Sequence, residues 1–333
     1  MRVALLDDYQ GVALAMADWG ALGAGVRTEA FGDHLKNPAA VADRLGPFDV
    51  IVAMRERTPF TEPLLARLPG LRLLVTTGMA NASIDLAAAT RLGIVVCGTE
   101  GLHYPTAELT WGLILALARH IPHEHHATRD GAWQTTLGVG LRGKALGVIG
   151  LGRLGAQVAA IGGAFGMRVL AWSQNLTPER AAERGVERVT EDDLLARSDV
   201  VTIHLKLSPR TTGLIGAREL GMMKRTAFLV NTSRGPIVEE RALLDALTRG
   251  GIAGAGLDVF DDEPLPADHP FRRLPNAVVT PHLGYVTRET YEVFYRDAAE
   301  DVRAFLDGRP VRVLNPDVLS PPGPRRVGMK KEA

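Results

Sequence analysis

Three short stretches of the chain carry the side chains best suited to acid–base chemistry on a carboxylic acid. They are NTSRG (231–235), GLDVFDDEP (256–264) and TPHLG (280–284). Arg234 can hold a carboxylate through two parallel hydrogen bonds, and His282 can pass a proton near neutral pH. One carboxylate of the second stretch, Asp261, Asp262 or Glu263, can orient and charge the histidine. Together these groups predict a site that binds an acid and moves a proton.

Each of the three stretches comes at the end of a short apolar run, so each is expected where a strand ends. In an open parallel sheet the carboxyl ends of the strands meet at one edge, and ligands bind there. Taken singly, an arginine, a carboxylate turn or a histidine at such a place is more often an ion-pair, solvated or packing residue. The functional interpretation rests on their combination with a dinucleotide-binding turn.

The stretch VIGLGRLG supplies that turn. Gly150 allows a tight turn, Gly152 lets the backbone approach a pyrophosphate, and Gly155 permits close packing of the following helix on the strand. Backbone N–H groups near Arg153 and Leu154, at the positive end of that helix, would meet the phosphate charge. A strand is expected before the turn and a helix after it, as the fingerprint requires. The pattern predicts a nicotinamide dinucleotide cofactor.

The choice between NAD and NADP stays open in the sequence. Where the next strand ends, an acidic residue normally receives the ribose hydroxyls of NAD, but this chain has Ser173 and Gln174. Without a carboxylate nothing repels a 2′-phosphate, yet no arginine follows until Arg180. Lys206, in the later stretch HLKLSP, can supply positive charge or can be a solvated loop residue. We therefore expect only modest discrimination between NAD and NADP.

Short β-rich runs alternate with helical patterns along the chain, which predicts parallel βαβ units that position these stretches. Strands are expected near residues 3–6, 50–54, 71–76 and 94–97, and then near 145–149, 168–172, 200–205, 228–231, 255–259 and 278–280. Between the two series, residues 105–129 predict a buried helix that Pro122 can kink or end. The glycine turn comes almost halfway along the chain because a complete α/β unit precedes the unit that it opens.

Composition narrows the classes of protein. The 38 basic and 38 acidic residues cancel, so no net field favours nucleic acid or an anionic membrane, and neither is expected as a partner. The length predicts about two domains. The single cysteine, Cys97, excludes an internal disulfide. The start does not read as a signal peptide, and no run of about 18 apolar residues predicts a membrane span. We expect a cytoplasmic protein with a mobile tail from residue 320.

A competing interpretation is a zinc site in the stretch HIPHEHH. Its histidines are His120, His123, His125 and His126. His123 and His126 would share one helix face, but a clear third strong ligand is missing. No metal site is predicted.

The sequence resembles a known family, the D-isomer-specific 2-hydroxyacid dehydrogenases, which include glycerate, phosphoglycerate, formate and phosphite dehydrogenases. The resemblance covers about residues 45–310. The resemblance rests on five segments, TAELTWGLILALAR, LRGKALGVIGLGRLG, VNTSRGPIVEERALLDAL, GLDVFDDEP and NAVVTPHLG. It implies an α/β fold with two Rossmann-like or flavodoxin-like parallel-sheet domains and a cleft between them.

The resemblance also implies how the chain is divided. Residues 1–100 and 288–333 would form the substrate-binding domain, and residues 101–287 would form an inserted NAD(P)-binding Rossmann domain. Residues 288–306 would be a helix that returns to the first domain. In the family the connector between the domains often builds a dimer interface, so a homodimer is expected.

The catalytic set implied by the family is Arg, Glu and His, which carries over onto Arg234, Glu263 and His282. The family motif selects Glu263 over Asp261 and Asp262, which spacing alone does not do. Asp258 would face the nicotinamide carboxamide. The remaining cofactor contacts are expected at Leu205, Thr211, Thr232, Ser233 and Gly284, besides the glycine turn, Ser173, Gln174 and Lys206.

The substrate carboxylate in this family usually meets backbone amides of a glycine-rich loop in the first domain. Gly78, Met79 and Ala80 match that loop, with Ala80 where a second glycine is common, so the substrate is not specified. A further contact follows the strand IVAMR, which makes Met54 and Arg55 candidates.

The implied activity is hydride transfer between a nicotinamide cofactor and a D-2-hydroxy acid/2-oxo acid pair, without a metal. The sequence is also compatible with two alternatives: a dehydrogenase of a small anion such as phosphite or formate, and a dinucleotide-sensing regulator without turnover. The presence of all three catalytic residues argues against the regulator.

Overall fold

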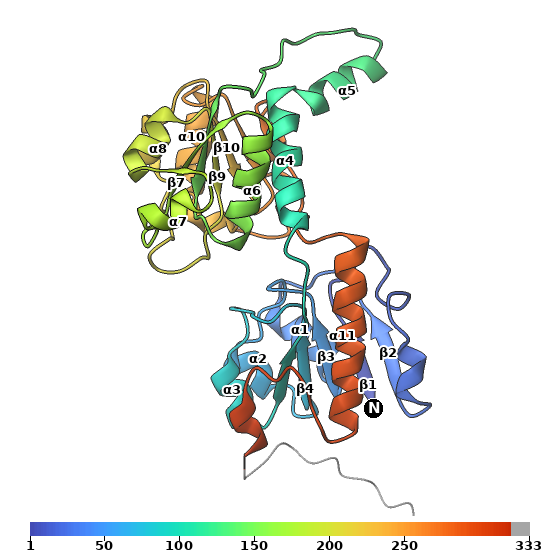
Figure 1. Cartoon of the computed structure of the whole chain (residues 1–333). Helices are drawn as coiled ribbons and strands as arrows, with labels where there is room; N and C mark the ends of the chain where they lie inside the picture. Colours follow the sequence, from blue (N-terminus) through green and yellow to red (C-terminus); the bar gives the residue numbers. More distant parts are fainter. Residues whose placement is uncertain (321–333) are drawn as a thin grey trace, which may run out of the picture. The chain divides into compact units, whose positions relative to one another are not determined.

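The computed structural model describes residues 1–320 and divides into two compact units (Figure 1). Among the described residues, unit 1 comprises Met1–Leu102 and residues 287–320, and unit 2 is His103–Val286, inserted between those two segments. All strand pairs in both sheets are parallel, which confirms the predicted α/β class. Residues 321–333, most of the predicted mobile tail, lie outside the described residues.

Unit 1 is built on a five-stranded sheet of order β2-β1-β3-β4-β5. Its strands are β1 (Arg2–Leu5), β2 (Arg27–Ala30), β3 (Val50–Ala53), β4 (Leu73–Thr76) and β5 (Val95–Gly98). Its helices are α1 (Pro38–Leu45), α2 (Glu62–Ala66), α3 (Leu86–Arg91) and α11 (Arg288–Leu306), with 3-10 turns η1 (Trp19–Leu22) and η4 (Pro316–Leu319). The continuous apolar runs of β3, β4 and β5 are buried on both faces, as parallel strands covered by helices require.

The edge strand β2 was not predicted from the sequence. Its residues, RTEA, are polar, and none of them is fully buried. It pairs with β1 alone, from Arg2 opposite Arg27 to Leu5 opposite Ala30. Backbone pairing to an already formed neighbour therefore creates this strand, without the apolar signal on which sequence patterns depend.

The C-terminal part of unit 1 is held by one buried amide side chain. Asn315 Oδ1 accepts from the backbone N–H of Val96, while its Nδ2 donates to the carbonyl of Ile94 and to Thr90 Oγ1. Both backbone partners belong to β5 or the residue just before it. The side chain therefore pins the segment after α11 to the sheet.

Replacing Asn315 by alanine should destabilise unit 1 by about 2–4 kcal/mol, because each buried polar group left unpaired costs about 1–3 kcal/mol. Urea unfolding and amide hydrogen exchange at β5 measure this. The control is Asn276→Ala, since the Asn276 amide makes a single bond, to the carbonyl of Leu247 in unit 2. Unchanged exchange at Val96 in the Asn315 variant would show that the side chain does not hold the segment.

Unit 2 is built on a seven-stranded sheet of order β12-β11-β10-β9-β6-β7-β8. Its strands are β6 (Ala145–Ile149), β7 (Arg168–Trp172), β8 (Glu187–Arg188), β9 (Val200–Ile203), β10 (Phe228–Asn231), β11 (Gly254–Leu257) and β12 (Ala277–Val279). Because β6 lies between β7 and β9, the order of the strands along the chain reverses there, and ligands of such sheets bind at this point.

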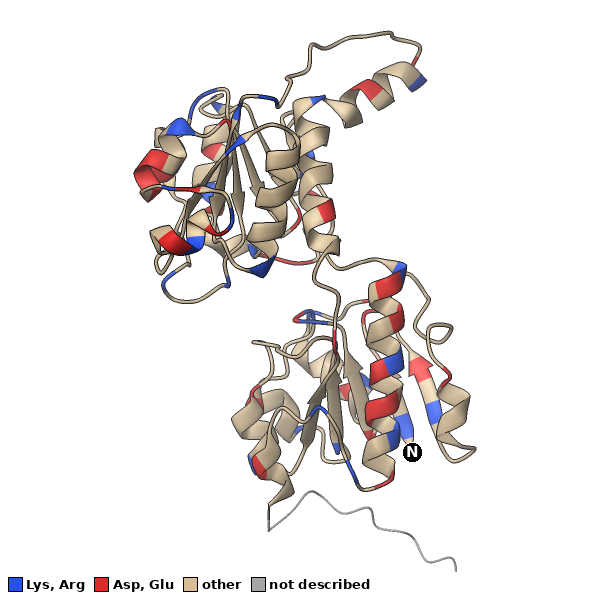
Figure 2. Ribbon diagram, in the orientation of Figure 1, with Lys and Arg blue, Asp and Glu red and all other residues tan. Residues whose placement is uncertain are grey.

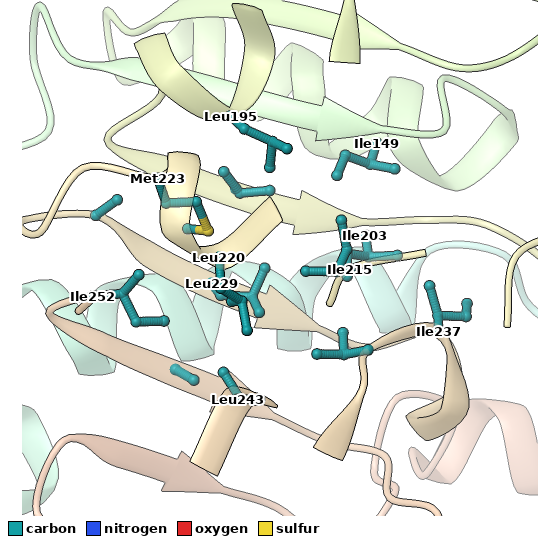
Figure 3. Close-up of a cluster of buried hydrophobic side chains, with 14 of the residues drawn as sticks. Ile149, Leu195, Ile203, Ile215, Leu220, Met223, Leu229, Ile237, Leu243 and Ile252 are labelled. Atoms are coloured by element: carbon teal, nitrogen blue, oxygen red, sulfur yellow. The ribbon is translucent and has the colours of Figure 1, made fainter. Parts of the chain in front are cut away.

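The helices of unit 2 cover both faces of its sheet. They are α4 (Pro105–Ala118), α5 (Ile121–Arg129), α6 (Arg153–Ala164), α7 (Pro178–Ala182), α8 (Glu191–Arg197), α9 (Ala217–Met222) and α10 (Glu240–Thr248), with 3-10 turns η2 (Gly235–Ile237) and η3 (Pro270–Arg272). On one face, residues of α8, α9 and α10 pack on strand residues such as Ile149, Ile203 and Leu229 (Figure 3). On the other face, α4 and α6 pack on the same strands.

The predicted buried helix of residues 105–129 is two helices. Its apolar first half forms α4, and a break follows at His120, whose φ of 52° is left-handed. Pro122 lies in the first turn of α5, where its missing N–H costs nothing. The proline thus lies just inside the start of the second helix and neither kinks nor ends the first one, and no residue of α5 is buried.

Charges of both signs are interspersed over both units (Figure 2). Among residues 1–320, no helix is both long and apolar enough to span a membrane.

Candidate active site

The three stretches with acid–base potential follow the adjacent strands β10, β11 and β12 of unit 2. Arg234 comes just after β10, Glu263 follows β11, and His282 follows β12. The parallel sheet therefore brings all three to the same edge, as the positions of the apolar runs predicted.

His282 and Glu263 form a direct pair. His282 Nδ1 lies 2.6 Å from Glu263 Oε2, and Glu263 Oε1 accepts from the backbone N–H of Phe260. Burial opposes ionisation of Glu263, but its hydrogen bonds with His282 and Phe260 and the charge of Arg234 outweigh burial, so the pKa of Glu263 is lowered. With Nδ1 engaged by the carboxylate, Nε2 is the ring nitrogen that can exchange a proton with a substrate.

The geometry also decides among the three acidic residues that the spacing left open. Glu263 is the one that contacts His282. Asp261 lies instead near Glu240, and burial together with that second carboxylate raises the pKa of Asp261. The carboxylate partner of the histidine is therefore Glu263, in agreement with the family motif.

Arg234 is half-buried and has an extended backbone. Its Nη1 donates to the carbonyl of Ser233, and its own carbonyl accepts from the Asn231 side chain. The next residue must be glycine, because a Cβ at Gly235 would overlap the backbone of Phe260. This close approach sets the arginine loop against the loop that carries Glu263.

Asp258 is buried and secures the histidine loop. Its Oδ1 accepts from Thr280 Oγ1 at 2.6 Å and from the N–H of Leu283 at 2.7 Å, and its Oδ2 accepts from the N–H of Gly284 at 2.9 Å. Burial, working against these bonds, raises the pKa of Asp258. The Asp258 carboxylate therefore positions the loop that carries His282. The sequence predicted only a contact between Asp258 and the nicotinamide, and did not reveal this positioning role.

Several predicted cofactor contacts lie around this edge and are held by hydrogen bonds within unit 2. Thr232 Oγ1 lies 2.9 Å from Thr110 Oγ1 on α4, and Ser233 Oγ donates to the carbonyl of Ile203. The carbonyl of Gly284 accepts from Thr106 Oγ1. These bonds tie the ends of β9, β10 and β12 to one another and to α4.

The glycine turn has the shape that a pyrophosphate requires. Gly150 has a φ of 97°, and a Cβ there would lie 2.5 Å from the carbonyl oxygen of His204. A Cβ at Gly155 would overlap the Gly150 carbonyl, whereas a Cβ at Gly152 would meet open space. Gly152 caps α6 without a side-chain bond, so the N–H groups at the start of that helix, near Arg153 and Leu154, face outward for an anion. The residues present fit a dinucleotide.

The predicted adenosine end of the site lies after β7 and β9. Ser173 is half-buried and Gln174 is exposed, and Gln174 Oε1 accepts from Arg210 Nη1. Lys206 is also exposed, but the residue that reaches Gln174 is Arg210, which sequence reasoning missed. Leu205 is half-buried, and its side chain would lie 2.9 Å from a Cβ on Gly150.

The predicted substrate loop of unit 1 follows β4 and is organised by Arg55. Arg55 donates from its backbone N–H to Thr77 Oγ1 and from Nη1 to the carbonyl of Thr77. Gly78 has a φ of 94°, and a Cβ there would overlap the Arg55 guanidinium. The N–H of Gly78 donates to Thr99 Oγ1, while Met79 and Ala80 are exposed.

Two further residues of unit 1 differ from the sequence-based picture. Met54 is 1% exposed and receives a hydrogen bond from Thr77 Oγ1 on its sulfur, so its side chain belongs to the core and not to an open substrate surface. Asn81 was not singled out, but its Nδ2 donates to the Arg55 carbonyl and to Thr76 Oγ1. Asn81 therefore joins the loops after β3 and β4.

The histidines considered as zinc ligands lie on or beside α5. His123 Nε2 lies 2.9 Å from Thr135 Oγ1, and His125 and His126 contact each other edge to face. In the part of the chain that the structure describes, no three His, Cys, Asp or Glu side chains come together as a metal site.

A glycine turn at the switch point of a parallel sheet, beside an acid–base pair and an arginine, defines a nicotinamide-dependent dehydrogenase. Comparison with known proteins makes this specific. The family model described as D-isomer specific 2-hydroxyacid dehydrogenase, NAD binding domain, matches residues 111–284. The chain belongs to this family, which confirms the resemblance seen in the sequence.

Relatives agree over most of the chain. A glyoxylate reductase of Aeropyrum pernix is 45% identical over 267 residues, 77% of this chain and 80% of the relative. A D-3-phosphoglycerate dehydrogenase of Bacillus subtilis is 38% identical over 279 residues, 83% of this chain but 53% of that longer protein. The crystal structure of a phosphoglycerate oxidoreductase from Vibrio cholerae O395 superimposes with a TM-score of 0.88 at 37% identity, covering 92% of this chain and 99% of the other.

Family membership establishes the activity class. The chain is an NAD(P)-dependent D-2-hydroxyacid dehydrogenase, and the predicted fold, reaction class and cofactor class are confirmed. Its relatives act on small hydroxy or oxo acids.

Proposed function

We propose that this chain reduces a small 2-oxo acid to the corresponding D-2-hydroxy acid, and catalyses the reverse oxidation, with Arg234, Glu263 and His282 as its catalytic set. The observation that carries the proposal is the 2.6 Å pair of His282 Nδ1 and Glu263 Oε2 at the sheet edge that also holds Arg234. Glyoxylate is the first substrate to test, because the relative with 45% identity is a glyoxylate reductase.

The catalytic residues divide the work in reduction. The Arg234 guanidinium binds the substrate carboxylate through paired hydrogen bonds and polarises the carbonyl. The glycine turn of unit 2 would hold the reduced nicotinamide cofactor, which would supply the hydride for C2. The proton that completes the new hydroxyl comes from His282 Nε2, while Glu263 holds the ring by Nδ1 and favours its charged form. Oxidation returns the proton to the same nitrogen.

Cofactor binding is proposed for unit 2. Gly150, Gly152 and Gly155, with Arg153 and Leu154, would hold the pyrophosphate. The ribose and nicotinamide contacts are proposed at the remaining predicted positions of unit 2, namely Ser173, Gln174, Leu205, Lys206, Thr211, Thr232, Ser233, Asp258 and Gly284. The shape of the glycine turn supports this assignment.

Substrate binding is proposed for unit 1, with residues 1–100 and 288–333 as the substrate-binding domain and 101–287 as the NAD(P)-binding domain. The loop from Gly78 to Ala80 would meet the substrate carboxylate with the N–H groups of Met79 and Ala80, because the N–H of Gly78 donates to Thr99 Oγ1. Arg55 shapes this loop through its bonds to Thr77, and we leave the buried Met54 side chain out of the substrate site.

A panel of 2-oxo and 2-hydroxy acids, with phosphite and formate included, tests the function when each is assayed with both nicotinamide cofactors by absorbance. We expect turnover with a 2-oxo acid in the reductive direction and with its D-hydroxy acid in the oxidative direction. Turnover confined to phosphite or formate would assign the chain to the small-anion alternative. Cofactor binding without any turnover across the panel would favour a dinucleotide sensor.

A homodimer is also proposed, built through the arm formed by α5 and the loop to residue 139. Figure 1 shows this arm extending from the body of unit 2. Ile121, Trp133 and Leu137 are 52%, 78% and 93% exposed, although the loop is braced on α5 by bonds from Thr135 and Thr136 to Glu124. An ordered arm with large exposed apolar side chains fits a second copy of the chain.

The double variant Trp133→Ser, Leu137→Ser should therefore be a monomer in light scattering after size exclusion, while the natural chain is a dimer. Removing the two side chains deletes the most exposed apolar area of the arm. Leu14→Ser, which changes an exposed leucine in unit 1, is the control and should stay dimeric. A dimer that survives the double change would place the interface elsewhere.

A cytoplasmic location remains a prediction.

A further inference from the structure

One hydrogen bond joins the two loops that border the glycine turn. The strands β7 and β9 lie on either side of β6, so the segments that follow them flank the turn that follows β6. Gln174 belongs to the first segment and Arg210 to the second, 36 residues further along the chain. Arg210 Nη1 donates to Gln174 Oε1 at 2.9 Å. The guanidinium thus reaches the place where dinucleotide sites of this type bind the adenosine ribose.

The turn that carries Arg210 is braced, although Arg210 is exposed. The N–H of Ser208 donates to Thr211 Oγ1 at 2.8 Å. The Thr211 hydroxyl in turn donates to the carbonyl of Lys206, also at 2.8 Å. The N–H of Thr212 donates to the carbonyl of Ser208. These bonds fix the backbone at Arg210, so less conformational entropy is lost when its side chain binds an anion. They also give Thr211, a predicted cofactor contact, a structural role.

The charges at this place favour an anion. Ser173 and Gln174 stand where a carboxylate would bind the ribose of NAD, and both are neutral. A second guanidinium supports the loop after β7, since Arg188 Nε donates to the carbonyl of Leu176.

We propose that Arg210 binds the 2′-phosphate of NADP(H), and that the chain therefore prefers NADP(H) to NAD(H). A guanidinium presents paired N–H groups that match two phosphate oxygens, and one bond to Gln174 leaves four of its five donors for this. Gln174 is a positioning residue, because it holds the arginine beside Ser173. The preference for NADPH over NADH in kcat/KM rests on the proposed function, because it requires turnover of a substrate. Binding of the 2′-phosphate by Arg210 does not rest on it.

The first measurement is the ratio of kcat/KM for NADPH to kcat/KM for NADH. We expect a ratio of about tenfold or more in the natural chain, which corresponds to about 1.4 kcal/mol. Arg210→Gln keeps a long polar side chain without its charge and should lower the ratio about tenfold, close to one. Ser173→Asp should also lower it, since a carboxylate repels the phosphate and accepts from the ribose hydroxyls.

The matched control is Arg225→Gln. Arg225 is an exposed arginine of the same unit that precedes β10, at the opposite end of the strands, and its Nε donates to the carbonyl of Gly250. This change removes the same net charge and should leave the ratio as in the natural chain.

The second measurement is equilibrium binding by calorimetry, with adenosine 2′,5′-bisphosphate compared with 5′-AMP. The natural chain should bind the bisphosphate about tenfold more tightly, and Arg210→Gln should remove most of the difference. If binding behaves so but no acid is turned over with either cofactor, the inference holds and the proposed function fails. A natural chain that prefers NADH, or a ratio that Arg210→Gln leaves unchanged, overturns the inference while the proposed function stands.

Discussion

Replacing His282 by alanine should lower kcat for reduction of the 2-oxo acid by at least about 10²-fold, the usual cost of losing a general acid–base. The change removes the only group that our proposal uses to protonate the substrate oxygen, and Glu263 is then left without its imidazole partner. Cofactor affinity should stay near that of the natural chain, because the glycine turn after β6 is untouched. Steady-state kinetics with glyoxylate and a fluorescence titration of the reduced cofactor measure the two quantities separately.

The chain offers a matched control for this variant. His269 also pairs with a carboxylate, with Nε2 lying 3.1 Å from Glu240 Oε1, and it is buried to a similar degree in the same unit. His269→Ala should keep kcat within about threefold of the natural value, since the pair lies outside the proposed catalytic set. Near-normal turnover in His282→Ala, or an equal loss in both variants, would refute the assigned role of His282.

The fold was largely predictable because its strands carry a simple signal. The runs VIVA, LLVT and ALGVI are short, apolar and buried on both faces, which is what a covered parallel sheet requires of its inner strands. The signal fails at the edges of the sheets. β2 and β8 read RTEA and ER, and pairing with one established neighbour holds each of them in place.

The positions of the proposed site residues were predictable where they follow a strand or belong to a family motif. Arg234 and His282 follow apolar runs, so their common edge could be inferred from the sequence. The choice of Glu263 could not be made from spacing, because it depends on a turn in which the Phe260 N–H holds one carboxylate oxygen and leaves the other for the histidine.

Arg210 was missed for a different reason. It meets Gln174 across 36 residues of sequence, and only the strand order β9-β6-β7 brings the two segments together. Asn81 was missed in the same way, since its partners lie in loops that the sheet of unit 1 makes neighbours. Sequence patterns find residues by local context, whereas these two act through tertiary contacts.

Replacing Glu263 by glutamine should move the pH profiles of both reaction directions to lower pH by about 1–2 units, because a charge-assisted hydrogen bond is worth about 1.5–3 kcal/mol. Reduction requires the protonated imidazole, and oxidation requires the neutral one. Reduction should therefore fall, and oxidation rise, as pH increases through the same interval. A charged carboxylate stabilises positive charge on its hydrogen-bond partner and a neutral amide does not, which gives the expected direction of the change.

The pair itself gives the sign. The hydrogen bond and charge of His282 help to lower the pKa of Glu263, so the carboxylate is held in its charged form beside the ring. Because the pKa of Glu263 lies below its ordinary value, the carboxylate stays charged through the neutral range, and the profile reports the ring. Above its transition, the glutamine variant should reduce the 2-oxo acid about 10–100-fold more slowly than the natural chain.

The profile of kcat/KM is the one to measure, since it reports the free enzyme, whereas kcat reports the bound complex. Glu240→Gln is the matched control, because it neutralises the carboxylate that pairs with His269 and should leave both profiles in place. A Glu263→Gln variant whose profiles stay unmoved would mean that the 2.6 Å contact does not set the charge of the ring in the working enzyme. The sign is decisive as well: a shift to higher pH would require Glu263 to act on the substrate rather than on His282.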